Sequence, residues 1–179
     1  MLSKEELVAT CVMLLFAGHE TTTHPIGNGV LALLRHPDQL QRLRDEPALL
    51  ARAVEELLRF DGPAQATFRR AATDLEIRGT TIRAGDYLYL LLGAANRDPA
   101  QFVDPDVLDL GRRDNRHLAF AHGPHFCPGA PLARLEAQVA IRTLLERFKT
   151  LRLATDRLEW RPNHVLRGLT SLPVLVSSR

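Results

Sequence analysis

One cysteine of this chain lies in a loop whose composition suits a thiolate. Cys127 stands in the run Phe120-Ala-His-Gly-Pro-His-Phe-Cys-Pro-Gly, directly before a segment with helical periodicity. The free N–H groups of a helix N-terminus favour the thiolate over the thiol at such a position. A thiolate held there can act as a metal ligand or as a nucleophile.

Two other interpretations of Cys127 start from the same residues. A lone cysteine is more often a small buried apolar residue than a ligand. His122 and His125 lie close enough in sequence to suggest a cysteine hydrolase, although no independent signature of a catalytic triad accompanies them. The other spaced motifs of the chain must therefore decide among the three interpretations.

Composition describes an ordinary globular chain. Its 179 residues are 45% hydrophobic and 25% charged, with a formal net charge of +2 and no basic run, so we expect no nucleic-acid partner. The spacing of Cys11 and Cys127 argues against a zinc site or a disulfide framework and fits a reducing compartment. The apolar run 8–17 follows Glu5 and Glu6 and is too short to span a bilayer. We therefore expect a cytoplasmic protein without a membrane partner.

The elements that must position these residues are mostly helical. Apolar periodicity predicts a long, mostly buried helix over 2–34, with Ser3 and Glu6 as a capping box and a kink at Pro25. The stretch 93–120 lacks periodicity, which is typical of a segment that is functional or wrapped tightly around something. Three further helices are predicted: a short one that ends at 44, one over 47–60 and one over 130–148. Short strands are predicted within 68–92, with the strongest signal over 87–92, and within 151–176.

A second motif, Ala17-Gly-His-Glu-Thr-Thr, lies inside the long helix. Gly18 costs the helix about 1 kcal/mol relative to alanine, so a packing or functional reason is expected. An acid beside a hydroxyl at such a weakened position can open a groove for water. Together with the pattern Phe-x-x-Gly-x-His-x-Cys-x-Gly around Cys127, this motif resembles the cytochrome P-450 superfamily. The resemblance implies that Cys127 is the proximal iron ligand of haem b, and that Glu20 and Thr21 relay protons during oxygen activation.

The resemblance also implies a buried ion pair beneath the haem. Glu56 and Arg59 match the family's Glu-x-x-Arg, which would otherwise be a common solvated pair on a helix face. The family often supplies a third partner, an arginine, but Val107 stands at that position here. Arg112 or His117 could take its place.

Further haem contacts follow from the resemblance. Arg70 matches an arginine that pairs with a haem propionate and His125 matches a second propionate contact, while Arg69 competes with Arg70 because strand alternation lets only one of them face a cofactor. The loop departs from the family at Ala121, which replaces a glycine, and at Pro128, which has no N–H to offer the sulfur. The implied haem contacts are Ala17, Gly18, Arg70, Phe120, Gly123, His125, Cys127 and Gly129, and the implied substrate contacts are Ala66, Leu169 and Thr170, in the loops 63–67 and 168–171.

The implied fold is mainly α with small β-sheets (α+β). It corresponds to the C-terminal half of the cytochrome P-450 fold, from the long oxygen-activation helix through the cysteine-loop helix and the terminal strands. We expect 1–179 to form one partial haem-thiolate domain that lacks the N-terminal half.

The implied activity is monooxygenation of a small organic substrate, with dioxygen and electrons from a ferredoxin- or flavodoxin-type donor. Arg112, Arg113 and Arg116 form a basic cluster that would dock this acidic donor, or else a solvated face. Two alternatives remain at this point: a haem-binding module that is not an oxygenase, and a truncated non-catalytic remnant.

Overall fold

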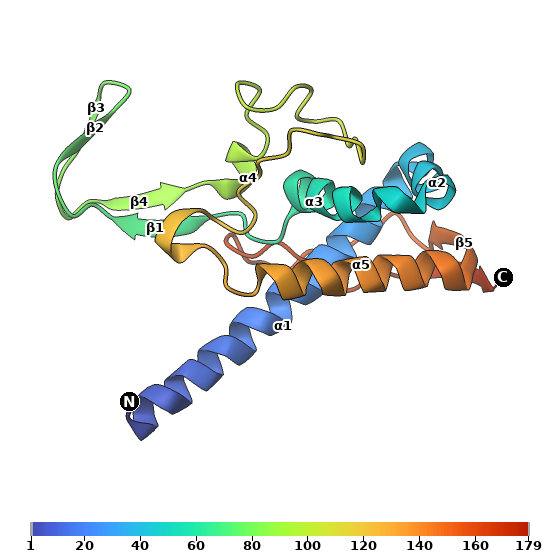
Figure 1. Ribbon diagram of the computed structural model, residues 1–179, viewed down its shortest axis with the longest axis horizontal. Coiled ribbons are helices and arrows are strands. Elements are labelled where there is room, and N and C mark those ends of the chain that lie inside the picture. Colours follow the sequence, from blue (N-terminus) through green and yellow to red (C-terminus); the bar gives the residue numbers. More distant parts are fainter. Residues whose placement is uncertain (1, 179) are drawn as a thin grey trace.

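The computed structural model describes residues 2–178 and is built around three helices that contact one another. The long helix α1 (Lys4–Arg35) crosses α5 (Ala130–Arg147), and α3 (Leu50–Asp61) packs against both (Figure 1). Helix α2 (Pro37–Asp45) and the 3-10 turn η1 (Pro47–Leu49) connect α1 to α3. The predicted helices are therefore present, and most of their ends lie within a few residues of the prediction.

The start of α1 follows from a local hydrogen-bond pattern. The Glu6 N–H donates to Ser3 Oγ at 3.2 Å, and the Ser3 N–H donates to Glu6 Oε2 at 2.8 Å. This is the predicted capping box, which satisfies two of the N–H groups that a helix start leaves free. The helix then continues through Pro25 to Arg35.

Three two-stranded antiparallel sheets accompany the helices. Strand β1 (Thr67–Arg70) pairs with β4 (Tyr87–Leu90), β2 (Leu75–Ile77) with β3 (Thr80–Ile82), and β5 (Phe148–Leu153) with β6 (Val174–Ser178). The β1–β4 pair reaches away from the helices and leads into β2 and β3 at its far end (Figure 1).

Three predicted strand boundaries were wrong. The strand predicted over 87–92 ends at Leu90, because the short helix α4 (Leu92–Ala95) begins almost at once. In the tail, β5 starts at Phe148 rather than 151, and β6 continues to Ser178. Phe148 already has an extended backbone, and no glycine or proline separates it from α5 to mark the change in the sequence.

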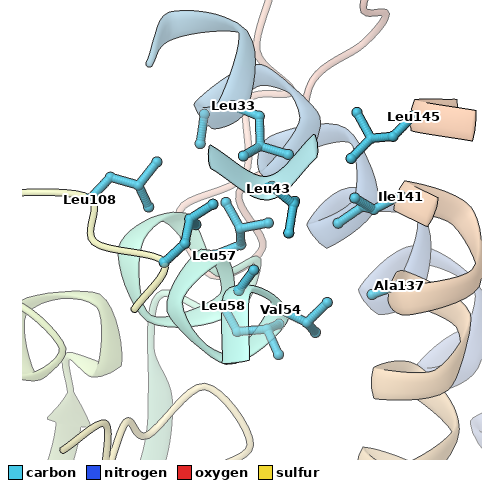
Figure 2. Packing of buried hydrophobic residues seen from close by; sticks show 12 residues of the cluster. Leu33, Leu43, Val54, Leu57, Leu58, Leu108, Ala137, Ile141 and Leu145 are labelled. Carbon is cyan, nitrogen blue, oxygen red and sulfur yellow. The ribbon is translucent and has the colours of Figure 1, made fainter. Parts of the chain in front are cut away.

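The hydrophobic core lies where the second half of α1 meets α2, α3 and α5. Leu33, Leu43, Val54 and Ile141, one from each of these helices, are at most 2% exposed, and they gather in one cluster (Figure 2). Leu108 closes this cluster from the irregular stretch. Burial of these side chains holds α3 and α5 at a fixed spacing, and α5 begins directly after the cysteine loop.

The first half of α1 is exposed, which corrects the prediction of a mostly buried helix. Val12, Leu15 and Phe16 are each more than 60% exposed, and this part of the helix extends away from the rest of the chain (Figure 1). Its apolar side chains remain open because no described element packs against them. Across residues 2–178, no helix has the length and apolar character needed to cross a membrane.

Candidate functional site

Cys127 lies between the 3-10 turn η2 (Gly123–His125) and the first residue of α5. Its N–H donates to the Phe120 carbonyl at 3.0 Å, which closes the loop, and its own carbonyl accepts from the Ala130 N–H at 3.3 Å. A Cβ added to Gly129 would lie 3.8 Å from Cys127 Sγ, so the backbone of Gly129 borders the sulfur. The half-buried thiol therefore lies at the N-terminus of an 18-residue helix, where the helix dipole favours an anion.

Ala121 takes a backbone conformation that disfavours its side chain. Its φ is +60°, in the left-handed region, and the nearby Gly123 has a φ of +77°. A residue with a Cβ is strained there by about 1–2 kcal/mol, whereas glycine is not. The departure from the family's glycine at this position therefore leaves local strain in the cysteine loop.

Replacing Ala121 by glycine is expected to stabilise the chain by about 1 kcal/mol, because relief of the left-handed strain exceeds the added flexibility of the unfolded glycine. Urea unfolding followed by circular dichroism measures this difference. Ala72→Gly, in the turn after β1 where φ is not positive, is the matched control and should not stabilise. An unchanged or lower unfolding midpoint for Ala121→Gly would show that the loop relaxes without strain.

Two aromatic rings flank the cysteine loop. The ring of Phe120 lies 6.4 Å from that of Phe126 in an edge-on arrangement. Phe126 is 49% exposed and offers an apolar surface immediately beside Cys127. The resemblance implies Phe120 as a haem contact, and Phe126 adds apolar surface to which the motif gives no role.

Glu56 and Arg59 form an ion pair with no exposed side-chain surface. Arg59 Nε and Nη2 each donate to a Glu56 carboxylate oxygen at 2.8 Å. Arg112 is the third partner, because its Nε donates to both Glu56 oxygens at 3.1 and 3.2 Å. The Val107 carbonyl accepts from both arginines at 3.2 Å. The irregular stretch 93–120 is thus wrapped around this buried charge network.

The basic cluster predicted for a redox partner is smaller than expected. Arg112 forms an ion pair with Glu56 and its side chain is only 10% exposed, so it belongs to the interior network. Arg116 lies at the surface and pairs with Asp114 at 3.0 Å. Arg113 is exposed. The prediction that Arg112 belongs to a surface cluster is therefore wrong. Sequence spacing alone could not show that its guanidinium points into the interior.

The structure places Arg69 and Arg70 on opposite faces of β1, as alternation requires. Arg70 is exposed, donates from Nε to the Gly85 carbonyl at 3.1 Å and stacks over Tyr87. Arg69 is half-buried, and its Nη1 donates to the Thr67 hydroxyl at 3.2 Å. His125, the other predicted propionate contact, is exposed in η2. The choice between the two arginines stays a prediction.

The predicted acid–alcohol pair occupies the middle of α1. The Thr21 hydroxyl donates to the Ala17 carbonyl one turn earlier, and Ala17 and Gly18 are exposed. Glu20 Oε1 lies 3.8 Å from Arg161 Nη1 in the tail, a partner that sequence reasoning missed. No local signal could have found it, because the two residues meet only through the fold.

One turn after Glu20, the ring of His24 is buried against the tail. A Cβ on Gly168 would lie 2.3 Å from this ring, so only glycine fits there. Burial lowers the pKa of His24, which outweighs the opposing effect of the nearby Glu20 carboxylate. His24 therefore favours the neutral form and packs as part of the contact between α1 and the tail.

The first predicted substrate loop, 63–67, is hydrogen-bonded to the residues just before the second, 168–171. The Gln65 N–H donates to the Val165 carbonyl at 2.8 Å, and the Arg167 N–H donates to the Pro63 carbonyl at 2.7 Å. The predicted contacts differ in exposure: Ala66 and Leu169 are buried, whereas Thr170 is exposed. Their role toward a substrate stays a prediction.

A second carboxylate of α3 binds the residues on either side of the cysteine loop. Glu55 accepts two hydrogen bonds from Arg134 of α5, at 2.7 and 2.9 Å, and one from His117 at 3.1 Å. Burial alone would raise the pKa of Glu55, but these hydrogen bonds and the charges behind them outweigh it and lower the pKa to about 2. Glu55 therefore stays ionised near neutral pH. Sequence reasoning missed it, although it directly precedes Glu56 of the matched motif.

The residues present fit a haem. Cys127 offers one soft sulfur ligand at a helix N-terminus, Phe126 gives an apolar surface beside it, and the exposed His125 offers a ring N–H donor for a propionate. Pro128 has no N–H to donate to the sulfur, so the candidate backbone donor is the N–H of the neighbouring Gly129. The site defines a protein of the thiolate-ligated haem class.

Comparison with known proteins gives the family. The family model described as Cytochrome P-450 matches residues 1–172. The biotin biosynthesis cytochrome P-450 of Bacillus subtilis (strain 168) is 54% identical over 173 residues, which cover 97% of this chain and 44% of that protein. The cytochrome P-450 monooxygenase PikC of Streptomyces venezuelae is 50% identical over 176 residues, which cover 97% and 42%. The chain belongs to the cytochrome P-450 family.

Solved structures agree with this assignment. The crystal structure of P-450BioI in complex with an acyl carrier protein ligated to hexadec-9Z-enoic acid has a TM-score of 0.96 and 53% identity, covering 98% of this chain and 46% of that one. The tirandamycin C-bound P-450 monooxygenase TamI gives 0.95 and 49%, covering 98% and 45%. The predicted family, the partial fold and haem b as the family's cofactor are confirmed. This chain spans less than half the length of these relatives.

Proposed function

We propose that this chain is the haem-binding part of a cytoplasmic monooxygenase that inserts one atom of dioxygen into a small organic substrate. The other oxygen atom leaves as water, formed with two electrons from a redox partner and two protons from solvent. The observation that supports this most strongly is the position of Cys127 at the N-terminus of α5, inside a loop that matches the family pattern.

Each group in the site has a separate task. Bound haem would supply the oxygen-activating iron, and Cys127 would hold it through a thiolate, whose electron donation favours O–O cleavage. His125 and either Arg69 or Arg70 would hold the propionates. Phe120 and Phe126 would keep water from the sulfur.

Protons would reach the site along α1. Glu20 is about one-third exposed, so solvent reaches its carboxylate, and the Arg161 guanidinium lies 3.8 Å from it. Thr21 follows it directly in the chain and would pass a proton by rotating its hydroxyl away from the Ala17 carbonyl. The exposed Arg113 and Arg116 would attract an acidic ferredoxin or flavodoxin.

Replacing Thr21 by alanine is expected to uncouple electron consumption from product, lowering the product formed per electron pair by about tenfold or more. The haem-loaded chain is supplied with a reducing donor and a substrate, and the hydroxylated product and hydrogen peroxide are measured together. Thr23→Ala is the control, since its hydroxyl makes the same kind of bond, to the His19 carbonyl, on the exposed face. Unchanged coupling in Thr21→Ala would remove Thr21 from the relay.

Incorporation of label from ¹⁸O₂ into product by the haem-loaded chain tests the proposed function itself.

The exposed apolar half of α1 favours a second candidate, a chain that folds but does not hold haem tightly. Tight haem binding without labelled product would instead identify a haem-binding module that is not an oxygenase. Weak haem binding would identify a non-catalytic part of the fold.

A further inference from the structure

We propose that Glu55 is a positioning residue for the iron-binding cysteine, acting through Arg134 and His117. The inference rests on the proposed role of Cys127 as the haem ligand. It assigns a task to a carboxylate that lies next to the buried Glu56 network but takes no part in it.

The carboxylate of Glu55 closes the cysteine loop at its base. His117 precedes the loop and Arg134 follows it in the first turns of α5, so both ends of the loop are tied to one side chain of α3. The Ala119 N–H donates to His117 Nδ1 at 3.2 Å, which leaves His117 Nε2 to donate to Glu55 at 3.1 Å. Backbone and side chain together therefore fix the tautomer and orientation of this ring.

The contact with Arg134 has the geometry of a strong pair. Two guanidinium nitrogens reach the two different oxygens of Glu55 at 2.7 and 2.9 Å, and each side chain is only about one-third exposed or less. Paired hydrogen bonds of this kind fix orientation as well as distance. Glu55 thus fixes the direction of the first turns of α5, and the Ala130 N–H at the start of this helix donates to the Cys127 carbonyl at 3.3 Å.

Arg134 and His117 also contact the ring of Phe120, at the start of the cysteine loop. The Arg134 guanidinium lies 4.5 Å from the centre of the Phe120 ring, and the His117 ring lies 6.1 Å from it. The Phe120 carbonyl in turn accepts the Cys127 N–H at 3.0 Å. A continuous set of contacts therefore runs from Glu55 to the backbone of the cysteine, and the depth of the sulfur depends on it.

The experiment compares Glu55→Gln with Glu136→Gln, both in a Cys11→Ser background that leaves Cys127 as the single thiol. Glu136 is an exposed residue of α5 that makes no side-chain hydrogen bond or ion pair within residues 2–178, so its change removes the same charge without touching the loop. The first measurement needs no haem: the rate at which iodoacetamide alkylates Cys127. We expect Glu55→Gln to raise this rate by about tenfold and Glu136→Gln to leave it unchanged.

The second measurement loads both variants with haem and records the fraction of the reduced carbon monoxide complex with the thiolate-type spectrum. Glu55→Gln should lower this fraction, and Arg134→Lys, which keeps the charge but loses the paired geometry, should fall between it and the parent. If circular dichroism shows that Glu55→Gln has lost its helical structure, the alkylation rate and thiolate fraction of Arg134→Lys are compared with those of Glu136→Gln instead.

Equal alkylation rates and equal thiolate fractions in the parent and the variant would overturn the role of Glu55. Failure of the proposed function looks different: the parent itself would show no thiolate-type spectrum. In that case the alkylation rates alone decide whether Glu55 positions the cysteine.

Discussion

Replacing Arg59 by alanine is expected to lower the free energy of unfolding by about 3–5 kcal/mol, because it leaves a buried carboxylate without its main partner. Arg59 also donates to the carbonyls of Asn96 and Pro105, both at 2.8 Å. Its loss would therefore release the irregular stretch from α3 as well. A domain is stable by only about 5–15 kcal/mol, so the variant should be largely unfolded or marginal.

Urea unfolding followed by circular dichroism measures this loss. Arg52→Ala is the matched control, since Arg52 lies on the exposed face of the same helix and should change stability by less than about 0.5 kcal/mol. Arg59→Lys should recover only part of the difference, because a lysine cannot make the paired contact with Glu56. Similar midpoints for Arg59→Ala and Arg52→Ala would contradict the structural role of the ion pair.

Replacing Cys127 by serine is expected to weaken haem binding by at least about tenfold, since loss of a contact that merely supports a metal ligand already costs about 10–100-fold. Serine preserves the size of the side chain but removes the soft sulfur ligand that suits iron. Haem titration followed by absorbance gives the affinity. Cys11→Ser, on the exposed half of α1, is the control and should bind as the parent does. Equal affinities for the two variants would place the iron elsewhere.

Local sequence signals predict the elements that position the site. The capping box at Ser3, the apolar period of α3 and the glycine- and proline-rich loop before α5 each depend on residues a few positions apart. Helix ends, turns and i,i+3 pairs are local properties, and sequence spacing predicts them well. This is why the spacing of Glu56 and Arg59 is enough to predict that they pair.

The partners that meet through the fold cannot be found this way. Sequence spacing allows either Arg112 or His117 as the third partner of Glu56, and the structure gives Arg112 to Glu56 and His117 to Glu55. Adjacent residues on a helix point in directions about 100° apart, so two neighbouring glutamates serve different networks. Arg161 reaches Glu20 only because the tail folds back over α1.

The central claim is that the sulfur of Cys127 binds the iron of haem. The most direct measurement is the absorption spectrum of the haem-loaded, reduced chain before and after addition of carbon monoxide. A Soret band shifted to the long wavelength of a thiolate complex, present in Cys11→Ser and absent in Cys127→Ser, is the expected result. A carbon monoxide complex of the parent chain without that shift would contradict the claim. So would a shifted band that persists in Cys127→Ser.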